Sequence, residues 1–355
     1  MHRKTEAHIN LDAIRSNFAL ACALAPQSKT MAVIKADAYG HGMLRVAKAL
    51  QDTAPAFAVA TIDEALELRN AGINNQLLVL QGATTSAACK VAAANKLTTM
   101  VHSPEQVQIV IEAAVSPSVW LKLDSGMHRF GLAPDDFVDA RSRLDAAGID
   151  VQVVCTHLAC ADDLNSDATR QQLKIFNDTT SQLGTPRSIA NSAALLARPE
   201  SHAEWNRPGY MLYGSSPFAV DVEVADKLQA AMTLNSEIIA IRAVPKGESV
   251  GYGARWTAAR PSIIGTVAIG YADGYPRHAR NGTPTLVNGK RAPLVGTVSM
   301  DAITIDLSEH DTAAVGDKVE LWGSGIAVNE IAAAAGTIGY QLLTGVSPRV
   351  PRSYA

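Results

Sequence analysis

The sequence predicts an α/β fold, a (β/α)8 TIM-type barrel, followed by a smaller, mostly antiparallel β domain. In the first part, short apolar runs alternate with alanine-rich helical stretches from about residue 10 to residue 225. In the second part, the runs are rich in Val, Ile and Thr, and Gly-containing turns lie between them. We place the boundary after residue 228, so that residues 1–228 form the barrel and residues 229–355 the β domain. The first nine residues or so are candidates for pairing with the second domain.

Eight apolar runs supply the strands of the expected barrel. Alternating strands and helices imply a parallel sheet, and eight such units in about 220 residues are typical of a closed barrel. The expected strands are 31–34, 57–60, 77–80, 97–101, 119–123, 151–155, 187–190 and 209–213.

Helix signals lie between these runs. Thr61, followed three residues later by Glu64, fits a capping box at the start of a helix. Gly72 is a stop signal at the end of the same helix. Ser103 is a candidate cap, with Pro104 at the first helical position. These signals predict helices that start directly after the second and fourth strands.

The second domain shows the pattern of antiparallel strands. Its extended runs are 232–244, 262–269, 285–294 and 302–307. The Asn288-Gly289 pair inside the third run is a strong hairpin signal. No low-complexity linker separates the two halves, so we expect the domains to pack against each other.

The composition gives no case for a nucleic acid or a membrane as partner. The 355 residues carry a net charge of −3, and no apolar run is long enough to span a bilayer. Residues 1–6 are charged and lack the apolar segment of a secretory signal, so we expect a cytoplasmic protein. The four cysteines match no zinc or redox motif, so we expect free thiols and no metal site.

The first apolar run ends in a lysine, which is the most informative feature of the chain. Lys35 is followed at once by a polar, Gly-rich loop that contains Tyr39. Burial at the end of a strand lowers a lysine pKa, because the charged form loses its water. A partly neutral lysine can form a Schiff base with a carbonyl and can carry a proton. A strand-end lysine that simply reaches solvent would explain the same position.

Other polar residues follow the expected strands, at the end of a barrel where catalytic groups lie. With Lys35, they are His102, Asp124, His157, Asn191 and Ser192, and Arg207 lies just before the expected eighth strand. Barrels often bind phosphate in the loops after strands seven and eight. The nearest candidate segments here are 190–193, with Ser192, and 207–210, with Gly209. A first-strand lysine that faces a phosphate site fits bound pyridoxal phosphate. Ordinary turn chemistry would account for Ser192 or Gly209 taken alone.

Nine segments of this chain, in order and at similar spacing, resemble the motifs of the alanine racemases. They are 32–42, 121–131, 156–157, 190–193, 207–214, 251–254, 270–274, 296–301 and 349–351. The resemblance runs from about residue 7 to residue 352. The lysine segment is shared more loosely with other barrel-type pyridoxal phosphate proteins, whereas the segments around Tyr252 and Met300 are more particular to the racemases.

The resemblance implies two catalytic bases. Lys35 would hold pyridoxal phosphate covalently and then act as one base at Cα of the amino acid. Tyr252 would be the other base and would reach the cofactor bound by the partner subunit. The resemblance therefore implies a head-to-tail homodimer whose active sites are shared between subunits, with a small amino acid as substrate.

The resemblance also implies the binding residues. Tyr39, Ser192, Gly209 and Tyr210 would bind the phosphate, and Arg129 would contact the phenolic oxygen of the cofactor. Substrate contacts would come from the second domain and from Arg129. The implied cofactor-binding set is Lys35, Tyr39, Arg129, His157, Asn191, Ser192, Arg207, Gly209 and Tyr210, and the implied substrate-binding set is Arg129, Met300, Asp301 and Tyr271.

Two further implied contacts concern proton transfer. Phenols with a pKa of about 10 hold their protons at neutral pH, so a tyrosine base needs help. In the family, the residues matching His157 and Arg207 form a chain of contacts to the tyrosine that matches Tyr252. Arg207 would also face the pyridine nitrogen, and an arginine cannot accept a proton from it. A strand-end histidine and a glycine-flanked interface tyrosine would explain His157 and Tyr252 without any catalytic role.

Lys122 and Pro348 need separate comment. Period two places Lys122 on the same face as Trp120 and Asp124, where an unpaired charge inside a barrel would be costly. In many family members the matching lysine is carbamylated and pairs with the residue matching Arg129; a bond from Lys122 to a carboxylate is the alternative. Pro348 stands where some members have a tyrosine, so the resemblance does not define one wall of the substrate pocket.

Three alternatives to a strict alanine racemase remain. A racemase with a broader range, including serine, is consistent with Pro348, since a pocket discriminates one methylene by only about 1–3 kcal/mol. A barrel-type amino-acid decarboxylase would need a carboxylate at the pyridine nitrogen, where this chain has Arg207. A pyridoxal phosphate carrier without turnover would resemble the first domain alone.

Overall fold

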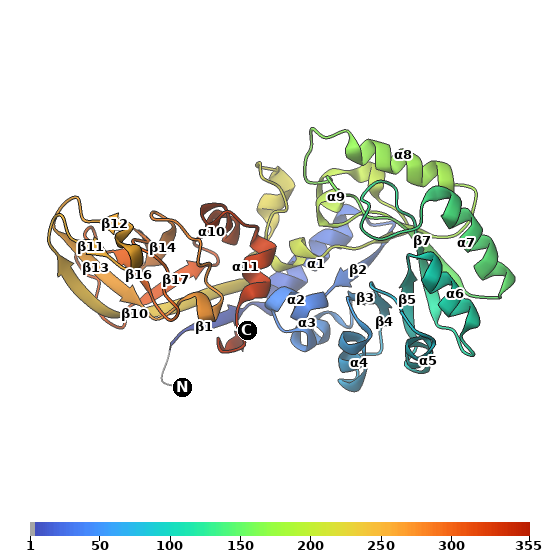
Figure 1. Cartoon of the computed structure of the whole chain (residues 1–355), viewed down its shortest axis with the longest axis horizontal. Coiled ribbons are helices and arrows are strands. Elements are labelled where there is room, and N and C mark those ends of the chain that lie inside the picture. Colours follow the sequence, from blue (N-terminus) through green and yellow to red (C-terminus); the bar gives the residue numbers. More distant parts are fainter. Residues whose placement is uncertain (1–3) are drawn as a thin grey trace.

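The computed structural model describes residues 4–355 and confirms a barrel followed by a mostly antiparallel β domain (Figure 1). The first three residues of the charged N-terminal segment lie outside the described part. No helix in residues 4–355 is long and apolar enough to cross a membrane.

The barrel closes through eight parallel strands in chain order. Their inward and outward side chains are almost all buried, as expected when helices cover a parallel sheet. The strands are β2 (Lys29–Val33), β3 (Ala56–Val59), β4 (Gln76–Val79), β5 (Leu97–Val101), β6 (Ser118–Lys122), β7 (Val151–Cys155), β8 (Arg187–Ser188) and β9 (Trp205–Asn206).

The predicted eighth strand is wrong. The barrel closes with β9, and the predicted segment forms a 3₁₀ turn, Tyr210–Tyr213, that is buried on all sides. A run that is apolar all round reads as a buried strand from sequence, whereas a two-residue strand is too short to leave a periodic signal. The correction places Arg207 directly after the last strand, at the carboxyl end of the barrel.

The helices surround the barrel, and their predicted start signals are confirmed. Thr61 and Glu64 form a reciprocal capping box on α4, and Ser103 caps α6 through the backbone N–H of Gln106. The helices are α1 (Leu11–Leu24), α2 (Lys35–Gly40), α3 (Met43–Leu50), α4 (Ile62–Asn70), α5 (Ser86–Ala94), α6 (Pro104–Glu112), α7 (Pro134–Ala146), α8 (Ala168–Thr180) and α9 (Ser192–Ala197).

A second sheet forms the other domain, with the order β15-β14-β17-β10-β1-β18. β13 pairs with β10, and β16 pairs with the other side of β13. The predicted hairpin is confirmed, because Asn288 and Gly289 turn β14 into β15. The strands are β1 (Glu6–Ile9), β10 (Met232–Val244), β13 (Ser262–Val267), β14 (Pro284–Val287), β15 (Lys290–Pro293), β16 (Ile303–Asp306), β17 (Lys318–Trp322) and β18 (Arg352–Tyr354), with β11 (Ser249–Val250) and β12 (Trp256–Thr257) as a separate pair.

The two ends of the chain and two late helices connect the domains. β1 pairs antiparallel with β10 and parallel with β18, so both termini join the second sheet. Helices α10 (Val328–Ala335) and α11 (Gly339–Gly345) lie between this sheet and the barrel, with α11 beside α2 (Figure 1). Residues from the second part of the chain therefore reach the mouth of the barrel.

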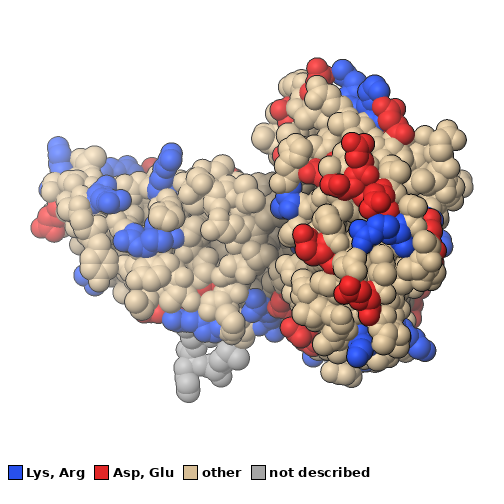
Figure 2. Space-filling view, turned by 45° about the vertical axis from the view of Figure 1, so that its right-hand side comes forward, with Lys and Arg blue, Asp and Glu red and all other residues tan. Residues whose placement is uncertain are grey.

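The charged surface differs between the domains. On the face drawn in Figure 2, acidic side chains gather on the barrel, whereas the second domain shows mostly Lys and Arg. Neither sign covers the whole face, which agrees with the small net charge of −3.

Candidate active site

The backbone that follows Lys35 has an unusual conformation. Directly after it, the residues from Ala36 to Tyr39 have φ between 52° and 55°, so α2 is one left-handed turn rather than an ordinary helix. A left-handed conformation costs about 1–2 kcal/mol per non-glycine residue. Strain of this kind collects at functional sites, where the surrounding structure enforces it.

Hydrogen bonds from three other elements hold the left-handed turn. The backbone N–H of Ala36 donates to Glu64 Oε1 at 2.8 Å, and the N–H of Met43 donates to Asp37 Oδ1 at 2.7 Å. Arg352, from β18, donates through Nε to the carbonyl of Gly40 at 2.8 Å. The second domain thus helps to fix the segment that carries Lys35.

A small polar cradle lies at the start of the 3₁₀ turn. Ser192 Oγ accepts hydrogen bonds from the backbone N–H groups of Gly209 at 2.9 Å and Met211 at 3.3 Å. A Cβ on Gly209 would lie 2.6 Å from Tyr39 Oη, so no other residue fits between the two loops. The predicted neighbours Tyr39, Ser192 and Gly209 are therefore brought together.

Aromatic side chains surround this cradle. Tyr210 and Tyr340 stack with ring centroids 3.6 Å apart, and Tyr39 stacks on Tyr213 at 4.8 Å. The Tyr210 hydroxyl donates to Asn329 Oδ1, on α10, at 2.7 Å. Tyr340 was missed from sequence, because it lies in α11, far along the chain from every other wall of the site.

One cavity of about 860 Å³ joins these groups at the carboxyl end of the barrel strands. Its volume is in the range of pockets that enclose a cofactor-sized ligand. The predicted residues that line it are Lys35, Tyr39, Lys122, Arg129, His157, Asn191, Ser192, Arg207, Gly209 and Tyr210. His102 lies beside it, with Nε2 3.1 Å from the carbonyl oxygen of Gln81 and its ring against Phe130.

Burial and the cationic side chains of the cavity both lower the pKa values of its titratable groups. Burial, and then the charge of Arg129, lower the pKa of Lys35 below its usual value, while Glu64 opposes the shift. Burial, followed by Arg207 and the other cations, holds the pKa of His157 well below its usual value. Lys35 is thus closer to neutrality than a surface lysine, and His157 is uncharged.

Arg207 is buried and held by its neighbours. Its Nη1 donates to Ser188 Oγ, and its Nη2 donates to the carbonyls of Thr156 at 2.6 Å and Ile189 at 3.3 Å. These acceptors come from the ends of β7 and β8, so the guanidinium is fixed on three sides. Asn191 caps α9 by accepting from the N–H of Ala194 at 3.0 Å.

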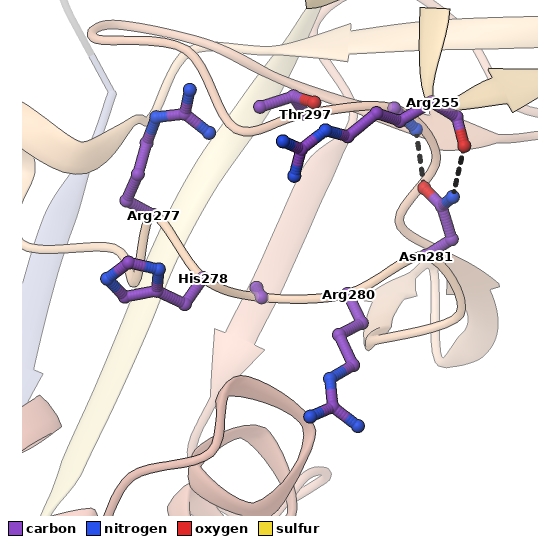
Figure 3. A pocket seen from close by; sticks show the side chains of 8 residues that line it. Arg255, Arg277, His278, Arg280, Asn281 and Thr297 are labelled. Carbon is purple, nitrogen blue, oxygen red and sulfur yellow. Dashed lines mark hydrogen bonds between the residues drawn. The ribbon is translucent and has the colours of Figure 1, made fainter. Parts of the chain in front are cut away.

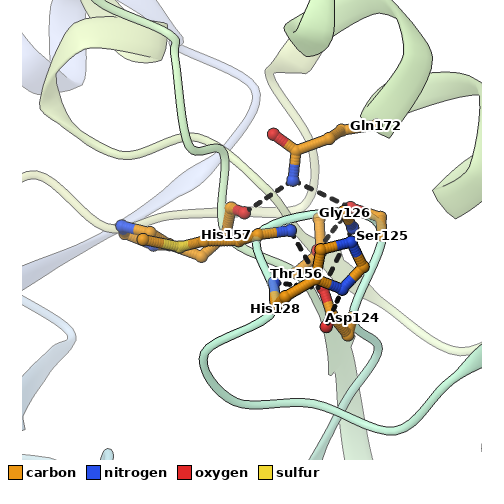
Figure 4. Close-up of polar contacts among 8 residues, drawn as sticks. Asp124, Ser125, Gly126, His128, Thr156, His157 and Gln172 are labelled. Carbon is orange, nitrogen blue, oxygen red and sulfur yellow. Dashed lines mark hydrogen bonds and ion pairs between the residues drawn. The ribbon is translucent and has the colours of Figure 1, made fainter.

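Lys122 is a buried cation without an acidic partner. Its Nζ lies 5.7 Å from the centre of the Phe130 ring, and burial lowers its pKa to about 8. The carboxylate of Asp124 is instead occupied: one oxygen accepts from the N–H groups of residues 126, 127 and 128, and the other lies 3.0 Å from His128 Nδ1 (Figure 4). Within residues 4–355, no ion pair joins Lys122 to any carboxylate.

Four predicted residues lie outside the cavity lining, on the second domain. Tyr252, Met300 and Tyr271 have exposed fractions of 71%, 53% and 41%. Asp301 pairs with Arg349 at 2.7 Å and is also exposed.

A second cavity, of about 810 Å³, lies in the β domain and is basic (Figure 3). Arg255 and Arg277 point into it from opposite sides, and Asn281 donates to the Arg255 carbonyl at 2.9 Å. It contains none of the predicted site residues, although Arg277 lies over the ring of Tyr271 at 5.9 Å.

Comparison with known proteins gives the family. The model of the alanine racemase N-terminal domain matches residues 9–217, and that of the C-terminal domain matches residues 231–354. The chain belongs to the alanine racemase family. It is 49% identical to the alanine racemase of Chromohalobacter salexigens, over 100% of this chain and 98% of the other.

Solved structures of family members agree. The biosynthetic alanine racemase of Pseudomonas aeruginosa is 47% identical, with a TM-score of 0.97 over 99% of both chains. The alanine racemase of Bartonella henselae, solved with covalently bound pyridoxal phosphate, is 28% identical, with a TM-score of 0.91 over 99% of both chains. As a member of this family, the protein is an isomerase, a pyridoxal-phosphate-dependent racemase of alanine.

Proposed function

We propose that this racemase works with two bases, Lys35 from the barrel and Tyr252 from the β domain of a partner subunit. The observation that supports this most is the placement of Lys35, which lines a cationic cavity next to the cradle of Ser192 and Gly209. Removal of a proton from one face of Cα and its return to the other needs a proton carrier on each face.

The residues of the barrel cavity fit pyridoxal phosphate. Burial raises the pKa of Tyr39 to about 12, so its hydroxyl stays a hydrogen-bond donor, as a phosphate oxygen requires. The missing Cβ of Gly209 leaves room for a phosphate against the backbone beside Ser192 Oγ. We assign the phosphate to Tyr39, Ser192, Gly209 and Tyr210, and the covalent link to Lys35.

Bound pyridoxal phosphate supplies a conjugated ring that accepts electron density when Cα loses its proton. Arg207 would hold the ring nitrogen in its unprotonated form, because a buried guanidinium keeps its own protons. This favours prompt return of the proton to Cα. Arg129 and the backbone of Met300 are assigned to the substrate and to the phenolic side of the ring, and Tyr271 and Asp301 to the approach of the substrate.

Lys35 and His157 prepare the two proton transfers. Because its pKa is lowered, Lys35 has a neutral fraction that can accept a proton from one face of Cα. His157 is uncharged and can therefore accept a hydrogen bond from a tyrosine hydroxyl, which helps that tyrosine give and take a proton on the other face. We assign this tyrosine as Tyr252.

A homodimer would complete the site. Tyr252 is 71% exposed and lies outside the cavity lining of its own chain, so a second copy must present it. We accordingly propose the division into residues 1–228, which bind the cofactor, and 229–355, which supply Tyr252, Tyr271 and Met300 to the partner.

We propose that Lys122 is carbamylated. A carbamate would turn an unpartnered buried cation into an anion beside Arg129 and would remove the cost of burying it. Intact-mass measurement of gently purified protein should show one added carboxyl group. An unmodified Nζ in a high-resolution density map would overturn this assignment.

The reaction is tested by proton NMR of the purified holoenzyme with L-alanine in deuterated water, followed by chiral analysis. Loss of the Cα proton signal together with D-alanine formation is expected. Bound cofactor with neither change would refute the assignment. Carbon dioxide release would indicate a decarboxylase, and equal turnover of serine would indicate a broader racemase.

Pro348 is exposed and does not line the cavity, whereas Tyr340 contributes an aromatic ring to the lining.

A further inference from the structure

A buried glutamine on α8 connects two loops of the active site. Gln172 is 3% exposed, and its Nε2 donates to the carbonyl of His157 at 3.0 Å and to Ser125 Oγ at 3.4 Å (Figure 4). Its Oε1 accepts from the N–H of Ala159 at 2.9 Å. The His157 carbonyl can only accept and the Ala159 N–H can only donate, so these two partners define the positions of Nε2 and Oε1 in the side-chain amide. In this one orientation all three contacts form together.

The first loop that Gln172 holds is the one that carries His157. The flanking residues of this loop are fixed as well, since the Thr156 carbonyl accepts from Arg207 and the Leu158 carbonyl accepts from Asn191 Nδ2 at 3.4 Å. With the two bonds to Gln172, the backbone of four consecutive residues is anchored by side chains. The backbone position from which the His157 side chain extends is thereby fixed.

The second loop is the one that carries Arg129. Ser125 Oγ lies 2.8 Å from Thr156 Oγ1, and both hydroxyls are buried. Gly126 packs against Gln172, because a Cβ at this position would meet its Cγ at 3.4 Å. Asp124 closes the same loop through three backbone N–H groups. The amide of Gln172 and the contact between the Ser125 and Thr156 hydroxyls thus join this loop to the loop of His157.

We propose that Gln172 is a positioning residue for racemisation, which holds the loop of His157 in register with the loop of Arg129. The proposal rests on the roles proposed above for His157 and Arg129. Gln172 itself does not line the cavity, so it acts through these two residues and not on the substrate.

The main test is Gln172→Met in the full-length holoenzyme, which keeps the length of the side chain and removes all three bonds. Displacement of a catalytic group by about 1 Å can cost about a hundredfold in rate, so we expect kcat to fall between about tenfold and a hundredfold, with a smaller change in KM. Because His157 serves only the tyrosine face, the deuterium isotope effects with Cα-deuterated L- and D-alanine should change unequally.

Thr180→Val is the matched control. Thr180 is also buried on α8, but its hydroxyl donates to the Phe176 carbonyl within the same helix. A fall in kcat no larger than that of the control, or isotope effects that change equally for both enantiomers, would overturn the proposal. If the wild-type protein itself exchanges no Cα proton, the proposed function fails, and the two failures are thus distinguishable.

Gln172→Glu keeps the test decisive if the methionine variant does not fold. The introduced carboxyl still accepts from Ala159, but it can donate to the His157 carbonyl only when protonated. The activity relative to wild type should therefore rise as the pH falls. A ratio that is independent of pH would contradict the positioning role.

Discussion

Lys35 and Tyr252, the two proposed bases, differ in their exposure to solvent. Lys35 is enclosed, with its pKa lowered by burial and by Arg129, so one chain prepares it for proton transfer. Tyr252 is exposed and needs groups from elsewhere. A substitution at either position should separate chemistry from cofactor binding.

Tyr252→Phe should abolish the conversion of L- to D-alanine while the holoenzyme keeps the visible absorbance of its cofactor. The phenyl ring preserves the shape of the side chain and removes only the hydroxyl that carries the proton. Turnover and absorbance are measured on the same sample. Full activity of this variant would remove Tyr252 as a base.

His41 makes stability depend on pH. Its ring is fully buried, Nδ1 lies 3.0 Å from the carbonyls of Ala38 and Tyr39, and burial lowers its pKa from 6.5 to about 4. The unfolded chain therefore binds a proton more readily between these pH values, and stability is lost as the pH falls through this window. The contribution of His41 to the free energy of unfolding should drop by about 2 kcal/mol from pH 7 to pH 5.

Urea unfolding at both pH values checks this expectation. His41→Phe should reduce the loss of stability between pH 7 and pH 5, whereas His278→Gln, at an exposed position, should leave it unchanged. An undiminished loss in the phenylalanine variant would contradict the assignment.

At the level of elements, the turn after β9 controls the phosphate site. A Cβ on Gly209 would lie 2.6 Å from Tyr39 Oη and would fill the space assigned to the phosphate. Gly209→Ala should weaken pyridoxal phosphate binding at least about tenfold, since one lost or strained hydrogen-bonded contact to a charged group is worth about 1.5–3 kcal/mol.

Gly345→Ala is the control for this substitution, because a Cβ there meets nothing within 4 Å. Cofactor affinity is measured by fluorescence titration of both apoproteins. Equal affinities in the two variants would place the phosphate elsewhere.

The sequence predicted those elements whose signals are local. The capping residues Thr61 and Ser103 and the Asn288-Gly289 turn act within a few residues, so their outcome does not depend on the rest of the fold. The left-handed turn after Lys35 left no signal, because Ala36 and its neighbours are not glycines and are held by contacts from α4 and β18.

The same distinction holds for the site. Lys35 ends a predicted strand and Ser192 starts a helix, so the barrel pattern alone placed them at one end. Arg207 preceded the predicted eighth strand and reaches the same end only because the barrel closes with β9. Tyr340 and Gln172 lie inside helical stretches and reach the site only through tertiary packing. No periodicity distinguishes such residues from an ordinary buried helix face.

At the level of the whole molecule, the second domain serves the barrel in two ways. Within one chain, α11, β18 and α10 brace the mouth of the barrel through Tyr340, Arg352 and Asn329. Across the proposed dimer, the exposed face around Tyr252 and Met300 would close the cavity of the partner. Burying these side chains in an interface would also remove their apolar surface from water.

A heterodimer of two inactive variants tests the central claim most directly. Lys35→Ala and Tyr252→Phe copies are coexpressed with different tags, purified through both tags, and assayed for alanine racemisation. If each site combines Lys35 of one subunit with Tyr252 of the other, one of the two sites keeps both bases, and the heterodimer should show about half of the wild-type activity. If both bases come from the same chain, every site lacks one of them, and a heterodimer as inactive as the parent variants would contradict the shared active site.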